Sequence, residues 1–158
     1  MTQGEGTGSA LIGMAAAAGV AQVVAGVAMY LAGVYFAPWS MVVSLVVLLV
    51  CIIVGTRWYR DNRVGGAMTF AQALRVGIAI SFATGLIYAV YNVVSISFFY
   101  PHFLDDMVQA RVAQTHESFA GLRAEASVPG IAIPNLIRLT VFGSVLSLAT
   151  SWFIKRRG

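Results

Sequence analysis

Three side chains in the second half of the sequence are of the types that bind metal ions. His102, Asp105 and Asp106 fall within five residues of one another, and imidazole and carboxylate groups are common ligands of divalent metals. The next histidine, His116, lies further along the chain, so no second imidazole is close in the sequence. We interpret the three residues as solvated polar groups near a membrane surface. We predict no metal site and no catalytic residues.

Motifs of the common enzyme classes are missing from the sequence. It contains no nucleophile elbow, phosphate-binding loop, zinc-binding helix motif or dinucleotide glycine pattern. No histidine lies inside an apolar stretch, so the chain offers no imidazole there for haem or chlorophyll. Cys51, the single cysteine, can form no intramolecular disulfide. We expect no enzyme activity and no cofactor; an interfacial enzyme that uses His102 and its acidic neighbours is a distant alternative.

A few polar side chains interrupt the apolar stretches. Gln22, Asn92 and Ser147 either join the chain's own helices or line a path for a solute. We favour the first interpretation, because no acid, lysine or histidine lies in the middle of a stretch. Arg138 is the exception, about one turn inside the last stretch, where its long side chain can reach the interface. For Arg138 we favour a structural role over ligand binding.

The chain that carries these residues is far more apolar than a soluble domain. Of its 158 residues, 59% are hydrophobic and 10% are charged, against about a quarter charged in soluble domains. Four apolar stretches approach or exceed the roughly 20 residues needed to cross a bilayer. We predict an all-α integral membrane protein with one membrane domain over residues 10–154. Its transmembrane helices are expected over residues 10–36, 39–56, 70–100 and 133–154.

Local signals indicate where these helices begin and end. Pro38 and Trp39 predict an interfacial turn after the first helix. Thr69 and Gln72 have the spacing of a capping box, which predicts that the third helix begins near residue 70. Outside the membrane domain we expect a flexible N-terminus and a basic cytoplasmic tail, residues 1–9 and 155–158.

The segment between the third and fourth helices differs from the rest. Residues 102–127 carry apolar side chains at three-to-four spacing with acids between them, which predicts an interfacial amphipathic helix on the outer side. The sequence from Val128 to Gly130 is expected to break it. Pro134 suits the first turn of the last helix.

Small and polar residues recur at helical spacing on three of the predicted helices. Such residues let helix backbones approach closely in lipid, where van der Waals contact and hydrogen bonds replace the hydrophobic effect. The predicted helix-packing residues are Gly19, Gln22, Gly26, Gly33, Gly77, Ser81, Gly85, Asn92, Gly143 and Ser147. Because four short helices bury little surface, we expect some of these faces to bind other membrane helices.

Basic residues at the edges of the apolar stretches predict the topology. They form two groups, Arg57, Arg60 and Arg63 after the second helix and Lys155, Arg156 and Arg157 at the end of the chain. Lysine and arginine are enriched in cytoplasmic segments, so four spans give a multi-pass protein with both termini in the cytoplasm. No basic stripe interleaved with exposed aromatic residues occurs, and we expect no nucleic-acid partner despite the formal charge of +4.

The middle third of the sequence has a distinctive order of basic, aromatic and proline positions. These are Arg60, Asp61, Met68, Thr69, Phe70, Ala73 and Leu74, then Tyr88, Pro101, Phe103 and Asp105. The pattern, over residues 55–107, resembles the bacterial family catalogued as domain of unknown function 4199. The resemblance implies four helices in a bacterial inner membrane and no established activity, so it transfers no catalytic residues.

Two functional hypotheses follow from these features of the sequence. The first is a structural or accessory membrane protein, bound to lipids and to other membrane helices as a small subunit of a larger complex or as a homo-oligomer. The alternative is a minimal oligomeric transporter or channel for a small solute, with Gln22, Asn92 and Ser147 lining the path.

Overall fold

Four long helices form the body of the protein in the computed structural model, which describes residues 3–115 and 117–154. They are α1 (Gln3–Leu31), α2 (Ser40–Arg63), α3 (Phe70–Val94) and α6 (Val128–Ile154), and α3 continues into a π-helical turn, η1 (Ser95–Phe99). Each contains a segment long and apolar enough to cross a membrane. The prediction of an all-α membrane protein with four transmembrane helices is therefore confirmed.

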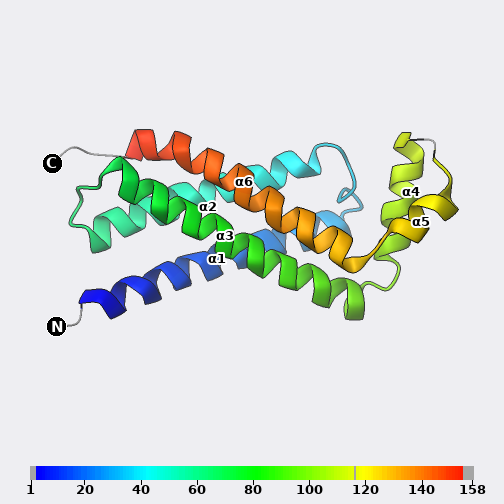
Figure 1. The fold of residues 1–158 in the computed structure, drawn as a ribbon, viewed down its shortest axis with the longest axis horizontal. Helices are drawn as coiled ribbons and strands as arrows, with labels where there is room; N and C mark the ends of the chain where they lie inside the picture. Colours follow the sequence, from blue (N-terminus) through cyan, green and yellow to red (C-terminus); the bar gives the residue numbers. More distant parts are fainter. Residues whose placement is uncertain (1–2, 116, 155–158) are drawn as a thin grey trace.

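The four helices run in alternating directions along one bundle (Figure 1). The start of α1, the end of α6 and the α2–α3 turn lie at one end, which we call the terminal end. The connection from α1 to α2 lies at the other end, together with two short helices, α4 (Phe103–Thr115) and α5 (Phe119–Glu125). We call this the hairpin end. The predicted amphipathic helix is thus two helices, and Ser118 caps the second by accepting a hydrogen bond from the Gly121 amide.

Helix α1 is longer at its start and shorter at its end than predicted. It begins at Gln3, inside the segment expected to be flexible, because extending an existing helix costs far less than starting one. It ends at Leu31 and not at Phe36, because Gly33 has a left-handed backbone with φ of 70°. The amides of Gly33 and Val34 bond back to the last turn, as in a Schellman motif. Gly33 is therefore a helix terminator, which corrects its assignment as a packing residue.

Helices α2 and α6 each extend beyond their predicted limits. Residues 57–63, predicted as a loop, form the last turns of α2, because the chain first adopts left-handed geometry at Gly65 and Gly66. Helix α6 begins at Val128, five residues early, because the Ser127 hydroxyl accepts a hydrogen bond from the Gly130 amide as an N-cap. Pro134 consequently lies inside the helix and not at its start.

The start of α3 agrees with the sequence. The backbone amide of Gln72 donates to the Thr69 hydroxyl over 3.3 Å, and the backbone amide of Thr69 donates to the Gln72 side-chain oxygen over 2.9 Å. The predicted capping box is confirmed, and it satisfies two backbone donors that the helix would otherwise leave unpaired.

Two glycine–serine pairs join α3 closely to α6. Gly77 of α3 faces Ser147 of α6, and Gly143 of α6 faces Ser81 of α3. On each helix the glycine and the serine are four residues apart, and because the helices are antiparallel each glycine lies opposite a serine. Each serine hydroxyl donates to its own helix backbone, Ser81 to Gly77 and Ser147 to Gly143. We call these four residues the glycine–serine contact. Buried Leu48, Ile52, Ile80 and Leu139 belong to the apolar core.

The glycine–serine contact makes a stability prediction. A methyl group on Gly77 would lie 2.7 Å from the Ser147 Cβ, so we expect Gly77→Ala to lower the free energy of unfolding by about 1–3 kcal/mol, as overpacking does. The matched control is Gly13→Ala in α1, where a new Cβ meets no atom within 4 Å and the better helix former should be neutral or stabilising. Unfolding in detergent followed by circular dichroism measures both.

A second variant tests whether steric overlap causes the effect. Adding Ser147→Gly to Gly77→Ala removes the opposing Cβ and should restore part of the lost stability. Equal effects of the alanine at positions 13 and 77 would contradict the close approach of α3 and α6.

Candidate functional site

A cavity of about 440 Å³ lies at the hairpin end of the bundle. Residues of α2, α3 and α6 form its walls together with the α1–α2 connection, and residues of α4 and α5 complete it. Its volume is within the range of about 300–1,000 Å³ that small-molecule sites occupy. The polar or charged lining side chains are Tyr35, Ser40, Ser44, Tyr88, Arg111, Glu125, Ser127, Asn135 and Arg138.

Two tyrosines meet in the cavity wall. Tyr88 of α3 is 4% exposed, and its hydroxyl lies 3.1 Å from the hydroxyl of Tyr35, in the α1–α2 connection. Gly26 of α1 makes room for this side chain, because a Cβ at that position would lie 2.9 Å from the Tyr88 hydroxyl oxygen. The small residue on α1 thus allows a phenol from α3 to reach the cavity.

Two arginines give the cavity a basic character. Arg138 projects from α6 and is partly buried, whereas Arg111 of α4 is exposed. Within the described part of the chain, no carboxylate oxygen lies within 4.0 Å of either guanidinium group. Glu125 of α5 is the one acid among the lining residues. The cavity therefore contains more positive than negative charge.

Helices α4 and α5 are attached to the bundle through aromatic and acidic side chains. Phe103 is buried against Tyr30, Tyr35 and Phe36, with ring centroids 5.3 to 5.6 Å apart. The Tyr30 hydroxyl donates to Asp106 over 3.0 Å, which joins α1 to α4.

An ion pair joins the two short helices to each other. The Arg123 guanidinium of α5 donates to the Asp105 carboxylate of α4 over 2.5 Å. The two carboxylates considered above as metal ligands, Asp105 and Asp106, therefore bind different protein groups. This attachment role was not predicted from the sequence.

The three polar residues considered for a solute path lie in three separate contacts. Gln22 of α1 donates to the hydroxyl and carbonyl oxygens of Ser44 in α2. Asn92 borders a small void beside Tyr30. Ser147 belongs to the glycine–serine contact. None of the three lines the cavity.

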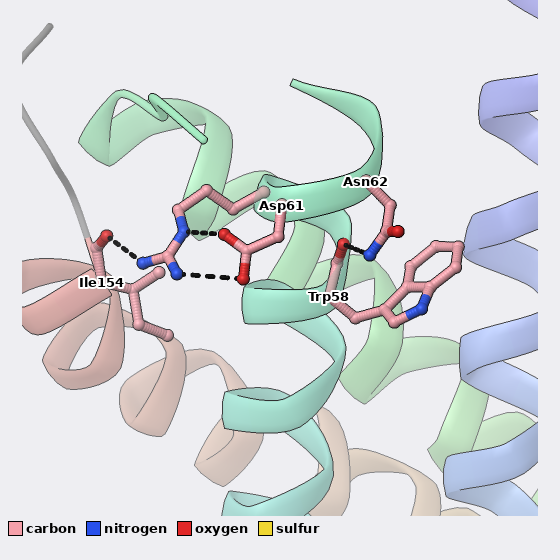
Figure 2. Close-up of polar contacts among 5 residues, drawn as sticks. Trp58, Asp61, Asn62 and Ile154 are labelled. Atoms are coloured by element: carbon pink, nitrogen blue, oxygen red, sulfur yellow. Dashed lines mark hydrogen bonds and ion pairs between the residues drawn. The ribbon is translucent and has the colours of Figure 1, made fainter. Parts of the chain in front are cut away.

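The first group of predicted topology residues lies at the terminal end. Arg60 forms an ion pair with Asp61 over 2.7 Å and also donates to the Ile154 carbonyl oxygen over 3.5 Å (Figure 2). In the same region the Asn62 amide donates to the Trp58 carbonyl, and the Arg63 guanidinium lies 6.0 Å from the Trp58 ring. The second group, Lys155, Arg156 and Arg157, lies outside the described residues.

Most cavity residues gave no signal in the sequence. Tyr35, Arg111, Glu125 and Asn135 are far apart along the chain, and none stands in a motif. Arg138 was informative, because a charge inside an apolar stretch is expensive and usually faces protein or water. Tyr88 and Phe103 belong to the pattern of the resemblance, which did not indicate a cavity.

The fold and the cavity together define a polytopic α-helical membrane protein with a basic pocket at one end. The family model described as protein of unknown function (DUF4199) matches residues 13–156, so the chain belongs to this family. The resemblance drawn from residues 55–107 is thereby confirmed over nearly the whole chain. No curated protein and no solved structure matches it.

The attachment of α4 to α1 makes a second prediction. The substitution Tyr30→Phe removes the hydroxyl that donates to Asp106. The free energy needed to open α4 locally should fall by about 1 kcal/mol. Amide exchange in α4 should then be about fivefold faster by hydrogen–deuterium mass spectrometry. Tyr59→Phe, at the terminal end, is the matched control. Unchanged exchange in α4, or the same increase in both variants, would show that this bond does not hold α4 in place.

Proposed function

We propose that this chain is a ligand-binding membrane protein that takes up a small molecule in the cavity at the hairpin end. The observation that carries this proposal is the cavity itself, which is large enough for a ligand and has converging tyrosine, asparagine and arginine side chains. Tyr88, Asn135 and Arg138 come from the long helices α3 and α6, whereas Tyr35 comes from the α1–α2 connection and Arg111 from α4.

Binding, and not catalysis, is the role that we propose. The polar lining groups are hydrogen-bond donors and acceptors, with the two guanidinium groups as the strongest donors. Among the described lining residues, no nucleophile forms a hydrogen bond with a basic side chain. These side chains are suited to orienting a polar group and offer no activated nucleophile.

Filling the cavity tests the proposal. Asn135 lines the cavity, and Asn135→Trp should occupy much of its volume and abolish retention of a bound small molecule. Ile137→Trp is the matched control on the same helix, because Ile137 is 58% exposed and lies outside the cavity. Native mass spectrometry of protein extracted gently from host membranes measures the extra mass. A wild-type protein with no retained molecule, or equal retention by both variants, would contradict the proposal.

An accessory role in a larger complex, or as a homo-oligomer, is the second candidate. The helix faces rich in glycine, which the sequence suggested as binding surfaces for other helices, give this role little support. They pack within the chain itself, at Gly19, Gly26, Gly77, Gly85 and Gly143. Helices α4 and α5 favour it instead, because they project beyond the long helices and have many exposed residues (Figure 1). The same mass spectra test the accessory role, because a purely monomeric species would count against it.

We further propose that both termini face the cytoplasm of a bacterial cell, in its inner membrane. The bond from Arg60 to the Ile154 carbonyl supports a common side for the two basic groups, and positive residues favour the cytoplasmic side. Reporter fusions after Gly158 and after Arg63 should both report the cytoplasm. A fusion after Glu117 should report the outside, and reporters on opposite sides at Gly158 and Arg63 would exclude this topology.

A further inference from the structure

We infer that the cavity recognises the negatively charged headgroup of an amphipathic lipid, one that carries a phosphate or a free carboxylate group, with Arg138 as its main contact. This inference rests on the proposed binding function and adds the chemical class of the ligand. It follows from three features of the cavity: an arginine that has no ion partner among the described residues, a second arginine in a lining that includes one acid, and a wall that is polar on one part and apolar on another.

Arg138 is placed where a charge is costly. It lies within the membrane-spanning segment Val128–Ile154, partly buried and without a carboxylate in reach among the described residues. Charged side chains in membrane segments usually pair with another group or face a polar cavity. Arg138 lines the cavity together with Tyr35 and Tyr88, which are neutral phenols and do not balance its charge. An anion would supply the missing partner.

The remaining charges of the cavity favour an anion over a cation. Arg111 adds a second guanidinium group from α4, and Glu125 is the one acid among the lining residues. A guanidinium group matches phosphate and carboxylate oxygens with two parallel hydrogen bonds. These bonds are strong where walls of low dielectric keep water away.

The apolar part of the wall indicates an amphipathic ligand and not a free ion. Met29, Met41 and Met107 line the cavity, and their flexible side chains adapt to irregular apolar groups. Outside the cavity, α2 and α6 expose Val42 and Ile133, which are 59% and 55% accessible. A headgroup held in the cavity therefore leaves its hydrocarbon chains beside surfaces that face lipid.

The test compares lipids that differ in headgroup charge. Wild-type protein in nanodiscs of phosphatidylcholine with a minority of phosphatidylglycerol should retain phosphatidylglycerol preferentially when released for native mass spectrometry. Arg138→Gln should reduce that retention about tenfold, as expected for one charge-assisted interaction, and should reduce phosphatidylcholine retention less, so that the preference for phosphatidylglycerol is lost. Arg75→Gln, at the terminal end, removes the same charge and should have no selective effect.

A second variant and a competition measurement complete the test. Because Arg138→Gln can also change folding, Arg111→Gln provides a variant of an exposed residue, and it should weaken phosphatidylglycerol retention in the same direction. Inorganic phosphate that competes with the lipid, with a competition lost in Arg138→Gln, would support the anion site and show that a free anion also enters it.

The outcomes separate this inference from the proposed function. Equal retention of the two lipids by the wild type, or equal losses in Arg138→Gln and Arg75→Gln, would overturn the anionic headgroup. A neutral ligand that is still lost in Asn135→Trp would leave the binding function intact. Absence of any retained molecule in the wild type would overturn both.

Discussion

The close approach of α3 and α6 is the constraint on which the rest of this bundle depends. In lipid, helices gain little from burying apolar surface, and van der Waals contact between backbones must hold them together. The glycine–serine contact provides this backbone approach at two places, because each glycine lies against a serine of the other helix. Each hydroxyl donates to its own helix backbone, so both serines of this contact have hydrogen-bond partners. The contact is thus close and still free of unsatisfied hydroxyl groups.

The register of this contact also positions the cavity. Along α3 the small residues continue from Gly77 and Ser81 to Gly85, which packs on Leu136 and Thr140 of α6. Less than one turn beyond Gly85, α3 presents Tyr88, and α6 presents Arg138 between Leu136 and Thr140; both side chains line the cavity. The cavity therefore lies beside the Gly85 contact between α3 and α6.

The sequence was sufficient for the membrane helices and insufficient for their ends and for the cavity. Long apolar stretches and the Thr69 capping box depend on neighbouring residues, and both could be predicted. The end of α1 depends on the backbone of Gly33, and the start of α6 depends on the Ser127 cap, which overrides the signal from Pro134. Helix ends are determined by such competition between local signals, and a pattern of hydrophobicity does not resolve it.

Side chains that act together in this protein are far apart in sequence. Asp105 and Asp106 are neighbours and suggested a shared ligand, yet one binds Arg123 and the other Tyr30. Arg138, for which a structural role was favoured from the sequence, is partly buried, lines the cavity and has no ion partner in the described chain, which supports the proposed anion site. One physical rule leads to both interpretations, the aspartates as parts of the fold and Arg138 as a contact for a ligand. A charge with a protein partner serves the fold, whereas a partly buried charge that faces a cavity without one is free to bind a ligand.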